Sequence, residues 1–85
     1  MFKQYQEIEL VQDMMSDELL GEPVQLHLGQ RGVIVDIHSG PGLPTGYDVE
    51  FFNEQGETIA VMIMTKEQIR PVKAAKTSSS AQDVA

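Results

Sequence analysis

The sequence contains no cysteine and no tryptophan, and it has 6 Lys plus Arg against 13 Asp plus Glu. Without cysteine the chain forms no disulfide, offers no thiolate to a metal and has no thiol nucleophile. This composition fits a reducing compartment, so we expect a cytoplasmic protein without redox chemistry of its own. The formal net charge of −7 argues against the clustered basic surface that neutralises nucleic-acid phosphates.

A chain of 85 residues has room for one small domain. It lacks the run of about 20 apolar residues that a membrane span needs, and its start, MFKQYQEIEL, shows no apolar signal-peptide region. Residues 73–85 read KAAKTSSSAQDVA, which is too poor in apolar surface to order itself. The sequence therefore predicts a folded domain over residues 1–72, a disordered tail over residues 73–85, and no contact with a membrane.

The apolar residues recur mostly with the two-residue period of β-strands. This alternation predicts strands over residues 4–11, 32–38, 47–52, 57–64 and 69–72. The segment 39–46, SGPGLPTG, holds three glycines and two prolines, which predicts a loop. Helix is the minority element, since only single turns are expected at Ser16–Gly21 and at Thr65–Gln68, the latter with a capping box.

Five short strands, a long first connection over residues 12–30 and a tight helical or 3₁₀ turn before the last strand are typical of a small SH3-like barrel. The other five-stranded barrel, the OB fold, generally has a substantial helix between its third and fourth strands. No segment of this chain can supply that helix. The fold class expected from the sequence is therefore all-β, as a five-stranded SH3-like barrel.

Three blocks of residues resemble a known family. They are LGQRGVIVD at 28–36, YDVEF at 47–51, and GETIAV at 56–61 continued by QIRPV at 68–72. Together with the MFK start they resemble the small bacterial family called domain of unknown function 4926, which is frequent in cyanobacteria. The resemblance covers residues 1–72 and implies a fold without an established activity.

A weaker likeness runs to the SH3-like barrel of the nitrile hydratase β subunit, through a G-x-x-G-x-V turn and a Y-x-V-x-F strand. That likeness implies an accessory subunit and transfers no catalytic residue. The chain departs from the pattern of the domain of unknown function 4926 family in two segments. Residues 13–28 are longer and more apolar, and residues 40–46 are richer in Gly and Pro.

Catalytic and metal-binding motifs are missing from the sequence. His27 and His38 are the only histidines, and neither stands in an H-x-x-x-H or H-E-x-x-H spacing. Ser16 and Ser39 have no G-x-S-x-G context. We expect no enzyme activity, no catalytic residues, no metal site and no cofactor.

The alternation of the strands predicts which side chains face inward. One phase would fill the interior with Val33, Val35, Ile37, Val49, Phe51, Ile59, Val61 and Ile63. The opposite phase would then expose an apolar cluster beside carboxylates, and this gives the predicted partner-binding set Ile34, Asp36, Asp48, Glu50, Phe52, Met62 and Met64. Ala60 belongs to the same exposed phase. Alternatively, the long connection over residues 12–30 folds over this cluster and covers it.

The function expected from the sequence is that of a non-catalytic module, an accessory or neutralising partner of another protein, with a second copy of the chain as another possible partner. The alternative is a nucleic-acid-binding SH3-like module of the KOW type. That alternative would need Arg31, Lys66 and Arg70 to form a basic stripe in three dimensions.

Overall fold

The computed structural model describes residues 2–17 and 21–72. Its strands are β1 (Glu7–Leu10), β2 (Met14–Met15), β3 (Gln25–Leu26), β4 (Arg31–Gly40), β5 (Leu43–Phe52), β6 (Thr58–Met64) and β7 (Ile69–Pro71). This part of the chain contains no helix, and so none long and apolar enough to cross a membrane. The predicted tail over 73–85 and the middle of the predicted turn at Ser16–Gly21 lie outside the described residues.

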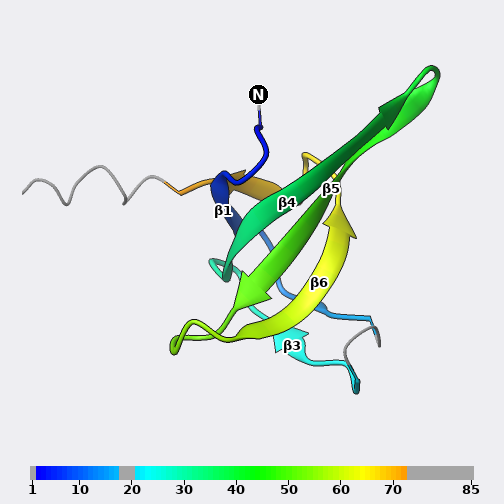
Figure 1. Cartoon of the computed structure of the whole chain (residues 1–85). Coiled ribbons are helices and arrows are strands. Elements are labelled where there is room, and N and C mark those ends of the chain that lie inside the picture. Colours follow the sequence, from blue (N-terminus) through cyan, green and yellow to red (C-terminus); the bar gives the residue numbers. More distant parts are fainter. Residues whose placement is uncertain (1, 18–20, 73–85) are drawn as a thin grey trace, which may run out of the picture.

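The strands form one five-stranded antiparallel sheet in the order β6-β5-β4-β1-β7, and a separate ladder of β2 with β3 (Figure 1). The all-β prediction is confirmed. The described strands do not close into a barrel, because β6 and β7 end the sheet on opposite sides without pairing. Figure 1 also shows that β4 and β5 continue beyond the other strands as a long hairpin arm.

The loop predicted over residues 39–46 is wrong, because most of these residues belong to the arm. β4 runs to Gly40, β5 begins at Leu43, and only Pro41 and Gly42 form the turn. Gly42 has φ 74°, and a proline followed by a glycine at positive φ is the pattern of a type II turn. Pro44 stands beside a shift in the pairing register between His38 and Gly40, where its missing N–H is tolerated. The number of Gly and Pro residues in this segment therefore led to a predicted loop that is longer than the real turn.

A second irregularity, at Val35, sets which side chains face inward. Ile34 pairs with Val49 and Asp36 pairs with Asp48, so Val35 is an extra residue in β4. Such a bulge shifts the side-chain alternation by one position. Ile34 and Ile37 therefore both contribute to the core although they stand three positions apart.

The predicted interior phase is confirmed for β5 and for Ile37 and Ile59, which pack against the core, but it is wrong for other parts of β4 and for the rest of β6. The buried apolar core consists of Ile8, Leu10, Leu26, Ile34, Tyr47, Val49, Phe51, Ala60, Met64 and Ile69. Val33 and Val61, which were expected inside, pair with Glu50 from either side on the opposite face of the sheet. Ile63 was also expected inside, but 68% of its surface is exposed.

The first connection covers the inner face of the sheet. Leu26 is fully buried, and Met14 and Val24 pack against the same cluster. Ser16 holds the connection together, because its N–H donates to the Val24 carbonyl at 2.8 Å and its Oγ accepts from the Val24 N–H at 2.9 Å. Of the two alternatives that the sequence left open, the intramolecular cover is the one found over Ile34, Ala60 and Met64.

The segment before β7 is a hydrogen-bonded turn and not a helix. The Gln68 N–H donates to the Thr65 carbonyl at 3.1 Å, and Gln68 Oε1 accepts from the Thr65 N–H at 2.9 Å. The predicted back-reaching Gln68 is thus present. At the N-terminus, β1 is shorter than expected because Lys3 to Gln6 form a turn in which Tyr5 has φ 69°.

The inverted phase of β6 leads to a direct test on two neighbouring residues. Met64 is 1% exposed and Ile63 is 68% exposed. We expect Met64→Ala to lower the free energy of unfolding by about 2–5 kcal/mol through the lost burial and the cavity. Ile63→Ala should change it by less than about 1 kcal/mol. Urea denaturation of both variants measures this, and a larger loss for Ile63→Ala would contradict the assignment of faces.

A second test concerns Gly32, where β4 lies tightly against β5. A Cβ at Gly32 would stand 2.6 Å from the Glu50 carbonyl oxygen and 2.8 Å from Val49 Cγ1, whereas at Gly40 the nearest atom would be 3.8 Å away. We expect Gly32→Ala to cost about 1–3 kcal/mol by overpacking, and Gly40→Ala, the matched control in the same strand, to be neutral. Equal thermal denaturation midpoints for the two variants would refute the tight contact.

Candidate functional site

The structure divides the predicted partner-binding residues between the two faces of the sheet. Ile34 is 0% and Met64 is 1% exposed, and the partly buried Met62 packs against the same core. The expectation that these three form an exposed cluster is therefore wrong. Their physical role is core packing, so charged substitutions at Met62 and Met64 would report on folding and not on partner binding.

The carboxylates of the predicted set lie together on the outer face of the sheet, which is the face turned away from the core. Asp36 and Asp48 are directly opposite each other on β4 and β5, and Glu50 is opposite Val33. Phe52 is half-buried at the end of β5. The acidic half of the predicted site is thus assembled, while its apolar half is not.

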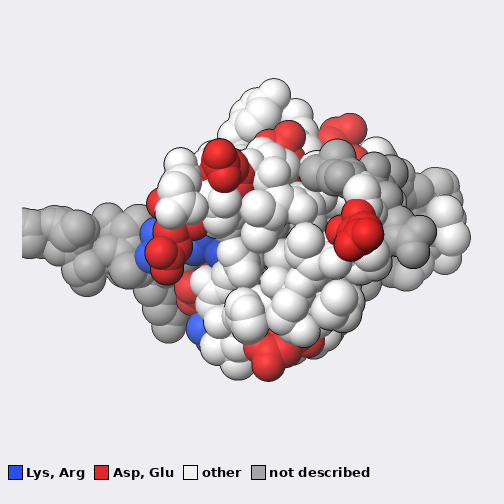
Figure 2. Space-filling model, turned by 90° about the horizontal axis from the view of Figure 1, so that it is seen from below, with Lys and Arg blue, Asp and Glu red and all other residues white. Residues whose placement is uncertain are grey.

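Near β1 and β7, charges of both signs balance each other. Arg70 Nε donates to Glu9 Oε2 at 2.8 Å, and Arg31 Nη1 lies 3.7 Å from Glu7 Oε2. On the face drawn in Figure 2, the Lys and Arg atoms are likewise gathered at one side next to carboxylates, while other acidic groups stand apart from them among uncharged residues. This part of the sheet presents paired charges.

The arm end of the sheet has a different surface, which we call the distal outer face and define by Asp36, His38, Leu43, Asp48 and Ile63. Leu43 is 71% and Ile63 is 68% exposed, and both line a cavity of about 230 Å³ together with His38. Among the described residues, neither carboxylate forms an ion pair with a Lys or Arg. This face therefore places exposed apolar side chains next to carboxylates that have no Lys or Arg partner among the described residues.

His38 links the two carboxylates of the distal outer face. Its Nε2 lies 2.8 Å from Asp48 Oδ2 and 4.0 Å from Asp36 Oδ2. The hydrogen bond to Asp48 raises the pKa of His38 above its ordinary value of 6.5, with smaller support from the negative charges of Asp48 and Asp36, while desolvation works against the rise. The imidazolium is thereby favoured as a local counter-charge.

No motif around His38 was recognised in the sequence. Its closest partner, Asp48, lies ten positions along the chain and reaches it only through the pairing of β4 with β5. The available signal was the D-x-H pattern of residues 36–38 facing a second strand that carries an aspartate. That signal has meaning only if β4 and β5 pair at these positions. A loop was predicted over residues 39–46, so the pairing of this part of the two strands was not expected.

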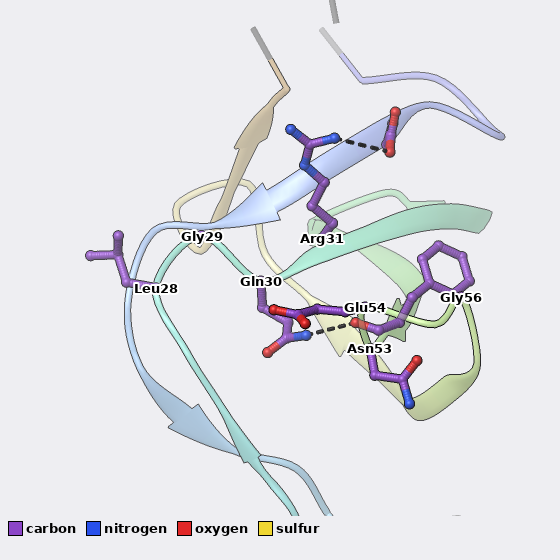
Figure 3. Close-up of a pocket in the computed structure, with 9 residues that line it drawn as sticks. Leu28, Gly29, Gln30, Arg31, Asn53, Glu54 and Gly56 are labelled. Atoms are coloured by element: carbon purple, nitrogen blue, oxygen red, sulfur yellow. Dashed lines mark hydrogen bonds and ion pairs between the residues drawn. The ribbon is translucent and has the colours of Figure 1, made fainter. Parts of the chain in front are cut away.

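A second hollow lies at the other end of the sheet, between the start of β4 and the turn after β5 (Figure 3). It has a volume of about 670 Å³. Gln30 Nε2 donates to the Phe52 carbonyl at 2.7 Å and so ties its two walls together. In Figure 3 the Leu28 side chain points away from Gln30 and Asn53. The Gln30 amide is already used in this contact between the walls, and Arg31, drawn above it in Figure 3, is in its ion pair with Glu7.

The family whose model matches this chain is the domain of unknown function family DUF4926, over residues 5–71. The chain belongs to this family, as its sequence blocks predicted. No curated protein and no solved structure matches it. Family membership therefore brings no activity, and a functional argument depends on the chain's own surface.

The contact between His38 and Asp48 predicts a pH dependence. Because the pKa of His38 is raised on folding, its stabilising contribution is complete below the unfolded pKa and is lost as the pH rises through the folded value. An NMR titration of the His38 ring should give a midpoint above 6.5, and Asp48→Asn should lower that midpoint.

The control for this titration is Asp36→Asn, which should lower the midpoint less, because the hydrogen bond comes from Asp48 and Asp36 contributes only through its charge. A His38 midpoint that does not respond to Asp48→Asn would show that the contact is absent in solution.

Proposed function

We propose that this chain is a non-catalytic module that binds another protein through its distal outer face. The observation that carries the proposal is the joint presence of exposed Ile63 and Leu43 beside Asp36 and Asp48, which have no Lys or Arg partner among the described residues. In protein interfaces, apolar contacts at the centre supply most of the affinity, and charges around them select the partner and speed its encounter.

The partner that fits this surface has a small apolar group for the cavity beside Ile63 and basic side chains around it. A net charge of −7 supports the same choice, because a long-range negative potential attracts a basic partner. An accessory or neutralising role toward a neighbouring protein in the cytoplasm agrees with this chemistry. A second copy fits less well, since two acidic faces repel each other.

We also propose that this all-β fold is of the SH3-like type. Five strands in one antiparallel sheet, a long first connection with its own small ladder and a tight turn before β7 support an SH3-like module. Nucleic-acid binding, the alternative from the sequence, gains no support from the charges. Two of the three residues it needs, Arg31 and Arg70, are already paired with glutamates.

The test compares two exposed apolar residues on different parts of the surface, Ile63 and Leu28, which are 68% and 59% exposed. Proteins captured from the native cell by the immobilised chain are identified by mass spectrometry, and the affinity of each is measured with purified components. Ile63→Ser should weaken the specific partner about 10- to 100-fold, which corresponds to the apolar contact that it removes. Leu28→Ser, the matched control, should leave the affinity unchanged.

Several results would overturn the proposal. Equal losses for the two variants would show that the distal outer face is not the docking surface. Capture of nucleic acid with strong salt dependence would identify nucleic acid as the partner in place of a protein. Concentration-dependent self-association that Ile63→Ser abolishes would identify a second copy of the chain as the partner. Unchanged affinity of every captured protein for Ile63→Ser would remove the proposed site altogether.

A further inference from the structure

We propose that Asp36, His38 and Asp48 form a binding site for a divalent transition-metal ion on the outer face of the β4–β5 arm. Each of the three side chains offers one ligand atom, and these atoms all lie within 4.8 Å of one another. The site shares Asp36, His38 and Asp48 with the distal outer face, but metal binding does not depend on the protein docking proposed above, because it can be tested on the isolated chain.

The donor set decides which class of metal the site would take. It combines one imidazole nitrogen with two carboxylate oxygens. Imidazole favours Zn²⁺, Ni²⁺, Cu²⁺ and Fe²⁺, while carboxylates also accept Mn²⁺. A tetrahedral zinc site has metal–ligand distances of about 2.0–2.2 Å, which places neighbouring ligand atoms about 3.3–3.6 Å apart. The 2.8 Å from His38 Nε2 to Asp48 Oδ2 is a hydrogen bond, which a metal ion would replace as Nε2 loses its proton and the two atoms move slightly apart, whereas the 4.0 Å from Nε2 to Asp36 Oδ2 would shorten.

The backbone holds the ligands from two strands. The bulge at Val35 puts Asp36 directly opposite Asp48, and bulges commonly turn a side chain toward a functional site. Asp36 and His38 are two positions apart on β4 and therefore share its outer face. The pairing of these two strands therefore brings the three donor atoms within 4.8 Å of one another.

The charges of the cluster also call for a cation. Two carboxylates directly opposite each other on adjacent strands destabilise a sheet. The only basic group with a recorded contact to either of them in the described part of the chain is His38. A divalent ion would neutralise both carboxylates together.

Space beside the cluster would allow the ion to complete its coordination. His38 lines the cavity of about 230 Å³ next to Leu43 and Ile63. Asp36 and His38 have side chains that are 59% and 54% exposed, while Asp48 is 26% exposed. The three protein ligands therefore leave positions for water or for a donor from another molecule, which is the arrangement of an open site and not of a closed structural one.

The experiment titrates the full chain with Zn²⁺ alone and measures binding by calorimetry. A separate titration with Mn²⁺ alone is monitored by paramagnetic broadening in NMR spectra. We expect one saturable site and selective broadening at residues 36, 38 and 48. His38→Ala, Asp36→Asn and Asp48→Asn should each weaken Zn²⁺ binding at least about 10-fold, since even the loss of an outer-shell partner costs that much. All three residues are on the surface, and the NMR spectrum of each variant confirms that it is folded.

Two controls separate a defined site from a diffuse attraction of cations. Glu50→Gln removes one negative charge from the same face and the same strand as Asp48→Asn, and His27→Ala removes the other histidine. Both should bind Zn²⁺ as the unmodified chain does. Absence of saturable binding, equal weakening by Glu50→Gln and Asp48→Asn, or loss of binding in His27→Ala would each overturn the proposal.

Discussion

The pairing of β4 with β5, with one extra residue at Val35, is the constraint on which the rest of the structure depends. Because side chains alternate between the faces of a strand, one inserted residue exchanges the faces of everything beyond it. Ile34 on one side of the bulge and Ile37 on the other both reach the core, while Asp36 is turned outward opposite Asp48. A single backbone irregularity thus serves the core and the acidic surface at once.

The same register explains why the two faces differ in chemistry. Inward, the paired strands bury Ile34, Val49 and Met64, and the first connection closes over them with Leu26. Outward, the sheet is electrically balanced near β1 and β7, where Arg31 and Arg70 meet glutamates, and acidic toward the arm. The binding surface proposed at the acidic end would leave the core packing untouched, because its side chains lie on the face of the sheet opposite to the core.

Much of the fold could be predicted from the sequence, and the errors have definite causes. The positions of the five strands of the main sheet and the inward phase of Tyr47, Val49 and Phe51 were predictable because polar residues separate them, whereas β2 and β3 were not expected within the first connection. In β6 nearly every residue is apolar, so alternation could not distinguish Ala60 and Met64 from Val61 and Ile63, and the faces were exchanged.

The bulge at Val35 has no residue signal of its own. The loop over 39–46 was overestimated because Pro44 fits beside a register shift, which only the paired strands reveal. The contact of His38 with Asp48 was overlooked for the same reason.

The central claim is that Ile34 and Met64 face the core while Ile63 faces solvent, and side-chain methyl NMR in the presence of a soluble paramagnetic probe tests it most directly. The probe enhances the relaxation of methyl groups according to their contact with solvent. The account predicts strong enhancement for the Ile63 methyl groups and protection of those of Ile34 and Met64, in line with their exposures of 68%, 0% and 1%. Enhancement of Ile34 and Met64 together with protection of Ile63 would contradict the pairing of β4 and β6 with β5 and the binding surface proposed from it.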